Sequence, residues 1–304
     1  MRFTQLLAPL RLPAALVTLG LLAPAISAHA AALAWDTFED YTAGSSLNTQ
    51  NGGTGWTSAW ESSNATQVSS TSISYNSGGI VRGGGNSMVI STSSTDALVR
   101  DTFTSGQTGS DFYVSMIFQV NNPEMGDTDK VGAGYTDSGS FFVMGANNSS
   151  DTGISALSRG GMNGSEINSR VAGDTASTSN NTIYYSTTYF LVVKYGWDAT
   201  ANAYSTVETW LNPTTSTSSG TSVLNEAGAG GSNNIVGIKS RVFYVGMSGS
   251  DPVYDNTTTL AFDDIVFGDS FASVTGAIPE PATYAVFAGL AILGIAVLRR
   301  RYRS

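Results

Sequence analysis

The sequence predicts an all-β fold of two packed antiparallel sheets, and three observations support it. Apolar and polar residues alternate with a period of two in several segments, and no helical periodicity appears from Asp36 to Phe271. The 304 residues include 34 Gly and are rich in Ser, Thr and Asn, a composition that suits short strands joined by turns. A hydrophobic content of 41% is ample for a core between two sheets.

The first 30 residues have the form of a secretory signal peptide. Two arginines lead into an apolar stretch from Ala14 to Ile26, and Ala28-His29-Ala30 offers a small-x-small cleavage pattern. We therefore expect export by the secretion translocon and cleavage by signal peptidase, with Ala28 and Ala30 as the recognised residues. The alternative is an uncleaved membrane anchor.

Strand-like alternation is plainest in four segments of the middle of the chain, and each segment has one apolar face. These segments are 111–120, 189–197, 203–213 and 241–247. Further strands are expected in 67–75, 87–91, 97–103, 140–144 and 260–267. We assign residues 31–273 to one sandwich domain, as antiparallel strands with short turns between them favour.

The C-terminal segment predicts a single membrane-spanning helix. The 17 residues from Ala282 to Leu298 are uncharged and mostly apolar, and as a helix they would extend about 26 Å. Arg299, Arg300 and Arg301 follow them, and positive charges favour the cytoplasmic side. We expect a linker at 274–281, the helix at 282–298 and a basic cytoplasmic tail at 299–304.

Three features at the chain end carry a family resemblance. Pro279-Glu280-Pro281, the apolar run and Arg299-Arg300-Arg301 occur in this order within the last 27 residues. Together they closely resemble the PEP-CTERM sorting signal of Gram-negative bacteria. The resemblance implies an exosortase that cleaves near the triplet, so the protein is anchored in the inner membrane in transit and then delivered to the cell surface or extracellular matrix. The alternative is a permanent C-terminal anchor with a proline-rich stalk.

A second resemblance concerns the middle of the chain. The segments DTFEDYTAGSSLNTQNGGTGW, YFLVVKYGW with ETWLNP, and LAFDDIVFG look like those of concanavalin A/laminin-G-like jelly rolls, over roughly residues 35–271. This resemblance implies an antiparallel two-sheet jelly-roll sandwich. Such folds host lectins, glycosidases and inert spacers, so the fold does not fix the function.

Charge and composition exclude several function classes. Six of the 14 basic residues lie in the terminal segments, which leaves 8 basic against 23 acidic residues, a formal net charge of −15, in the middle. This charge disfavours nucleic acid as a partner. The chain has no Cys, and its single His, His29, lies in the leader. Catalysis by Ser-His-Asp or Cys-His and zinc held by histidine are therefore excluded from the mature protein.

Glycosidase chemistry stays open as the alternative function, because it needs only two carboxylates that flank the scissile bond. The Glu-x-Asp-x-Glu strand pattern of jelly-roll glucanases is absent. Asp36, Glu39 and Asp40 cluster without matching it, and Glu208 stands alone on its strand.

Two acidic pairs are candidates for a structural calcium ion, the one cofactor that the sequence leaves open. Asp127 and Asp129 have Asp-x-Asp spacing but lack the remaining ligands of a calcium loop, so a solvated acidic turn is favoured. Asp263 and Asp264 are adjacent and should point to opposite faces, one bonding turn amides and one facing water. The run GGIVRGGG (78–85) lacks a Gly-Lys-Ser/Thr ending, so we expect a flexible strand connection and not a phosphate loop.

Aromatic residues are the candidates for carbohydrate contact, because sugars stack their C–H faces on exposed rings. Tyr113, Tyr204, Glu208 and Trp210 fall on the less apolar faces of their strands. The alternative is that loops cover these rings. Trp56 and Trp60 are expected in a packed loop at the sandwich edge.

The leading functional hypothesis is a non-catalytic, exported surface or matrix protein that contacts extracellular polysaccharide. A purely structural spacer and a carbohydrate-active enzyme are the alternatives.

Overall fold

The computed structural model describes residues 32–62, 66–91, 96–98, 100, 109–131, 142–146, 158–163, 165–171, 177–178, 181–214, 224–227, 241–245 and 258–276. The expected leader with Ala28 and Ala30, and the expected sorting segment from Pro279 to Arg301, lie outside these residues. Within the described ranges no helix is long and apolar enough to cross a membrane.

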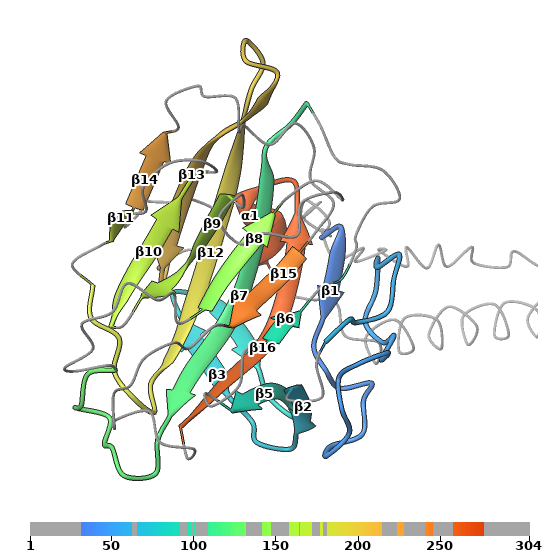
Figure 1. Ribbon diagram of the computed structural model, residues 1–304, viewed down its shortest axis with the longest axis vertical. Helices are drawn as coiled ribbons and strands as arrows, with labels where there is room; N and C mark the ends of the chain where they lie inside the picture. The colour runs from blue at the N-terminus through green and yellow to red at the C-terminus, as the bar shows by residue number, and fades with distance from the viewer. Residues whose placement is uncertain are drawn as a thin grey trace, which may run out of the picture.

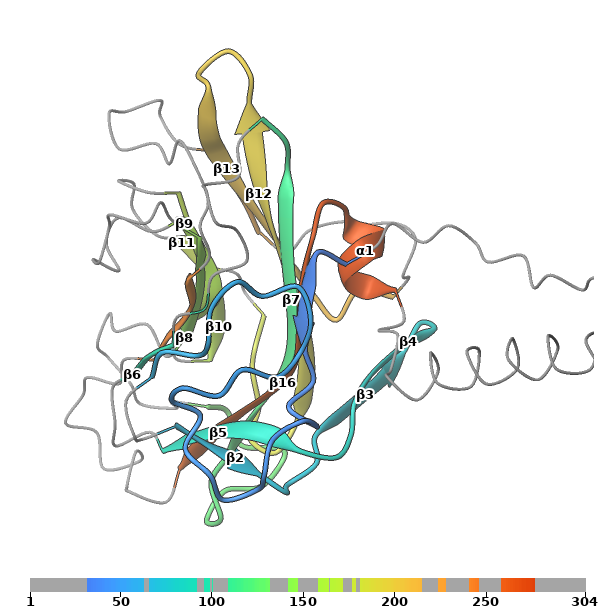
Figure 2. The same cartoon turned by 90° about the vertical axis from the view of Figure 1, so that its right-hand side faces the viewer.

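Two antiparallel sheets form the body, as the sequence predicts, and they stack as two layers (Figures 1 and 2). The larger sheet has the strand order β14-β13-β12-β7-β16-β5-β2, and β1 pairs with β16 beside this path. Its strands are β1 (Ala34–Asp36), β2 (Thr66–Ser69), β5 (Ser87–Ser91), β7 (Phe112–Asn121), β12 (Thr188–Asp198), β13 (Ala203–Leu211), β14 (Leu224–Ala227) and β16 (Thr259–Gly268).

The smaller sheet has the order β11-β10-β9-β8-β15-β6 and covers one face of the larger sheet. Its strands are β6 (Asp96–Leu98), β8 (Phe142–Ala146), β9 (Ser158–Asn163), β10 (Glu166–Arg170), β11 (Ser177–Thr178) and β15 (Arg241–Val245). The opposite face of the larger sheet, called the outer face below, carries the hairpin of β3 (Ser74–Ser77) and β4 (Ile80–Gly83) and the helix α1 (Phe271–Thr275) (Figure 2).

Alternate side chains of the central strands point to opposite faces of the larger sheet and enter two different cores. In β7, Phe112, Val114, Met116 and Phe118 point between the sheets into the main core. The intervening Ile117 points to the outer face, into a smaller core beneath α1 and the hairpin. Each large apolar side chain buried in this way contributes about 1.5–3 kcal/mol.

The run GGIVRGGG supplies the turn and the second strand of the β3–β4 hairpin, and not the flexible connection expected from sequence. Tyr75 and Ile80 are buried against the outer face, and Tyr75 lies 5.5 Å from the ring of Phe190. Gly78 (φ +60°) and Gly79 (φ +80°) form the two-residue turn, which needs left-handed backbone at both positions. The glycines therefore serve a tight turn.

Helix α1 corrects the expected domain boundary at 273/274. Ser270 caps the helix, and its hydroxyl accepts a hydrogen bond from the Ser273 backbone N–H at 3.2 Å. Val274 and Thr275 are 0% and 1% exposed, so they belong to the folded body and not to the linker. The described body continues to Gly276.

A buried ion pair holds the loop after β1 against the sandwich. Asp36 and Arg100 are each 1% exposed and meet at 2.5 Å. Asp36 also accepts hydrogen bonds from the Tyr41 hydroxyl at 2.5 Å and from Trp60 Nε1 at 2.8 Å. The Arg100 guanidinium lies over the rings of Trp56 (4.6 Å) and Trp60 (5.2 Å). The expectation of a packed loop around these two tryptophans is confirmed.

Candidate functional site

The outer face of the larger sheet carries a row of accessible side chains across three strands. Lys194 of β12 lies opposite Tyr113 of β7 on one side and opposite Glu208 of β13 on the other. Directly opposed side chains have Cβ atoms about 4.5–5.5 Å apart, so the three are contiguous. All three are partly exposed. Together with Asp111 they are called the Tyr113 row below.

Asp111 fixes the geometry of this row. Its Oδ2 atom lies 2.8 Å from Lys194 Nζ, and its Oδ1 atom accepts a hydrogen bond from the Trp197 backbone N–H at 3.0 Å. Lys194 Nζ also lies 5.9 Å from the centre of the Tyr113 ring. The carboxylate therefore joins the start of β7 to β12 and holds the ammonium beside the ring.

The charges of the row favour the ionised form of Lys194. Partial burial lowers the pKa of Lys194, but the hydrogen bond that its ammonium donates to Asp111, together with the charges of Tyr113, Asp111 and Glu208, raises it. The net result is a pKa above its ordinary value. Burial raises the pKa of the Tyr113 hydroxyl. At neutral pH the row thus presents the neutral phenol of Tyr113 and the ammonium of Lys194. The carboxylates of Asp111 and Glu208 are its hydrogen-bond acceptors.

Two of the four residues expected to contact carbohydrate are buried. Tyr204 is 1% exposed, and its ring packs edge-on against Trp197 at 5.0 Å in the main core. The cause is a bulge: the pairing of β12 with β13 passes from Gly196–Thr206 to Trp197–Tyr204 and skips one residue. A one-residue shift moves a side chain to the other face, so the expectation for Tyr204 is wrong.

Trp210 keeps its expected place on the outer face, but helix α1 covers it. The indole is 2% exposed and lies edge-on against Phe271 of α1 at 5.3 Å. The alternative of a covered ring holds here, and the cover is a helix rather than a loop. Trp210 therefore offers no face for stacking with a sugar.

Within the described residues, neither acidic pair belongs to a larger cluster of metal-ligating side chains. Asp127 and Asp129 are exposed, and Asp129 Oδ2 accepts a hydrogen bond from the Gly126 backbone N–H at 2.8 Å, as in a solvated turn. In the part of the chain that the structure describes, no three His, Cys, Asp or Glu side chains gather closely enough to hold a metal ion.

Asp263 and Asp264 both lie in the interior, so the expectation that one faces water is wrong. They are 0% and 7% exposed. Asp263 Oδ1 accepts from the Asp264 N–H at 2.7 Å, and Asp264 Oδ2 accepts from the Gly83 N–H at 2.6 Å. Burial, with the charge of Asp264, raises the pKa of Asp263 well above its ordinary value. These acids fasten the β4 end of the hairpin to β16.

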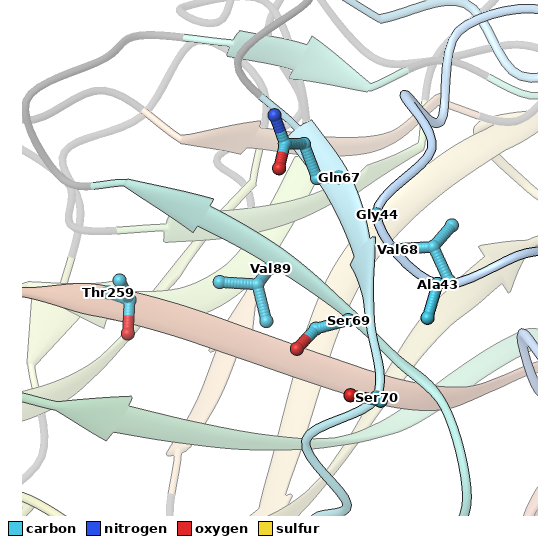
Figure 3. A pocket seen from close by; sticks show the side chains of 8 residues that line it. All are labelled: Ala43, Gly44, Gln67, Val68, Ser69, Ser70, Val89 and Thr259. Carbon is cyan, nitrogen blue, oxygen red and sulfur yellow. The ribbon is translucent and has the colours of Figure 1, made fainter.

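A shallow groove of about 590 Å³ lies at the β2 side of the larger sheet (Figure 3). Ser69, Val89 and Thr259 come from the three adjacent strands β2, β5 and β16. The full lining is Ala43, Gly44, Gln67, Val68, Ser69, Ser70, Val89 and Thr259. It contains no ionisable or aromatic side chain, so this groove supplies neither a pair of catalytic carboxylates nor a stacking platform.

Sequence reasoning found Tyr113 and Glu208 but missed Lys194 and Asp111 as members of the same site. The available signal is the alternation within 189–197, which sets Lys194 on the face opposite the apolar one. The register that sets it between Tyr113 and Glu208 is a property of strand pairing and is not visible within one strand.

Comparisons with known proteins give likenesses of structure only. No family model matches the chain, and no curated protein matches it in sequence. An endo-β-1,4-glucuronan lyase from the fungus Trichoderma reesei is 14% identical, with a TM-score of 0.41 over 77% of this chain and 98% of that one. Domain 4 of AbnA, a GH43 extracellular arabinanase from Geobacillus stearothermophilus, solved in complex with arabinotriose, is 11% identical, with a TM-score of 0.41 over 81% and 98% of the two chains.

The alginate lyase Aly36B is 13% identical, with a TM-score of 0.37 over 79% of this chain and 98% of that one. At such identities and TM-scores, these likenesses assign no family, activity or ligand to this chain.

Proposed function

We propose that this protein is an exported, non-catalytic surface or matrix protein whose jelly-roll body associates with extracellular polysaccharide. The observation that carries the proposal is the Tyr113 row: a partly exposed aromatic ring beside an ammonium and two carboxylates on the outer face of the larger sheet. The resemblance of the C-terminal segment to the PEP-CTERM signal supports export and sorting by exosortase.

The row offers the three contacts that a sugar needs. The Tyr113 ring supplies a face for the C–H side of a pyranose, since apolar sugar faces stack on aromatic rings. The Lys194 ammonium donates hydrogen bonds to hydroxyl oxygens, and Asp111 and Glu208 accept them. One such row binds weakly, and a polymer that engages many protein copies gains avidity from their number.

The direct test is retention of the protein on isolated extracellular polysaccharide after Tyr113→Ala. We expect retention to fall about tenfold, equivalent to about 1.4 kcal/mol, because the stacking face is removed. Tyr184→Ala is the matched control, since Tyr184 is also partly exposed and lies outside the row. Equal retention of both variants and the unmodified protein would contradict the proposal, and no retention of any form would favour the spacer alternative.

A further inference from the structure

The buried guanidinium of Arg82 binds the backbone at Val274 and Gly276, where the described residues end. Arg82 of β4 is 2% exposed, and its Nη2 atom donates to the carbonyl oxygens of Val274 (3.0 Å) and Gly276. The Val274 carbonyl also accepts from the Ser115 hydroxyl at 2.6 Å. Strands β4 and β7 thereby fix the end of α1, and the direction of the chain at Gly276 is set by the fold.

Two exposed apolar side chains belong to segments that pack against the same outer-face core as α1. Within the described residues the exposed large hydrophobic side chains are Val81, at 64%, and Leu33, at 38%. Val81 directly precedes Arg82 in β4. Leu33 lies between Ala32 and Trp35, which pack against the same core as α1. We call the surface formed by Leu33, Val81, α1 and Gly276 the exit face; α1 and the hairpin stand out on this side in Figure 2.

The length of the following segment limits how far the body can stand from a membrane. Five residues, 277–281, separate Gly276 from Ala282, where the apolar run begins. Six Cα steps reach at most about 22 Å. The lipid headgroup layer takes about 6 Å of that reach. About 16 Å of reach then remains, whereas a compact body of this size is about 45 Å across. The faces of the body opposite Gly276 therefore cannot reach the bilayer.

We infer that the exit face is a membrane-docking face, which rests on the lipid headgroups while the C-terminal segment is inserted. The inference rests on the proposed function, because it requires residues 282–298 to span the membrane. The short connection holds the face near the bilayer, and Val81 and Leu33 provide the apolar contact. The net charge of −15 in the middle of the chain and the exposed Asp269 before α1 favour a zwitterionic lipid surface over an anionic one.

The absence of cysteine from the chain permits a clean test with single-cysteine variants. Full-length Val81→Cys carries a fluorophore and is reconstituted into phosphatidylcholine vesicles that contain a headgroup quencher. Thr128→Cys is the control, because it is exposed in the loop that follows β7, and the six residue steps from Ser115 to Asn121 already span about 20 Å. We expect at least threefold stronger quenching at position 81 than at position 128.

Two readouts separate this inference from the proposed function. Retention of the full chain by vesicles after alkaline extraction tests the membrane span, and loss of retention would refute the span and the docking face together. Retention with equal quenching at positions 81 and 128 would overturn the docking face and leave the span intact.

Discussion

At the level of single residues, two ion pairs differ in how deeply their charged side chains are buried. Asp36 and Arg100 are both buried and bond each other along with several polar groups. Asp111 and Lys194 form a similar contact with side chains 38% and 25% exposed. Removal of one partner from a buried pair leaves an uncompensated charge, whereas an exposed pair is screened by water.

We therefore predict that Arg100→Met lowers the free energy of unfolding by about 3–5 kcal/mol, because it strands the Asp36 carboxylate among buried groups. Lys194→Met, at the exposed pair, should cost less than about 1 kcal/mol. Urea unfolding of both variants measures the difference. Similar losses in the two variants would mean that the Asp36–Arg100 pair does not act as a buried pair.

The buried Asp263 should make the stability of the protein depend on pH in a defined direction. Burial raises the pKa of Asp263 in the folded protein, so its ionisation is easier in the unfolded chain and stability falls as pH rises from the unfolded pKa through the raised folded value. Asp263→Asn removes this ionisation. We expect urea-derived stability to fall less from about pH 4 to pH 8 in the Asn variant than in the unmodified protein. Parallel pH profiles would contradict this assignment.

At the scale of elements, strand alternation was predictable and the exceptions to it were not. The segments 111–120, 189–197 and 87–91 correspond closely to β7, β12 and β5, because period-two patterns reflect burial on one face. The bulge that turns Tyr204 inward depends on pairing between two strands. Helix α1, which covers Trp210, has five residues, too few for a helical period to be visible.

The β3–β4 turn gives an element-scale prediction with a neighbouring control. A Cβ at Gly78 would lie 1.9 Å from the Thr214 carbonyl oxygen, whereas one at Gly79 meets nothing within 4 Å. Both glycines have positive φ, so alanine at either position costs about 1–2 kcal/mol of backbone strain.

Gly78→Ala should lose additional stability, because the hairpin must move away from residue 214. Thermal unfolding of the two variants measures this, and an equal decrease in Tm would show that the turn is not packed against that segment.

At the scale of the whole molecule, the outer face of the larger sheet carries both proposed contacts. Tyr113 of the row lies two residues before Ser115 in β7. The Ser115 hydroxyl binds the Val274 carbonyl and so helps to hold α1 at the exit face. On the proposed account, the exit face meets lipid during transit, and cleavage near Pro279 to Pro281 leaves the row open to polymer. The sequence predicted the sandwich and two of the four residues of the Tyr113 row. That the row and the exit face lie on the same side of the larger sheet follows only from tertiary packing.

We propose that this acidic β-sandwich is exported and sorted by its C-terminal segment. The most direct measurement is the intact mass of the protein recovered from the surface or matrix fraction of the producing cells. The account predicts a chain that begins near Ala31 and ends near Pro279 to Pro281, and retention in the inner membrane when Pro279 to Pro281 are replaced by alanine. Recovery of the chain from the cytosol with both ends intact would contradict it.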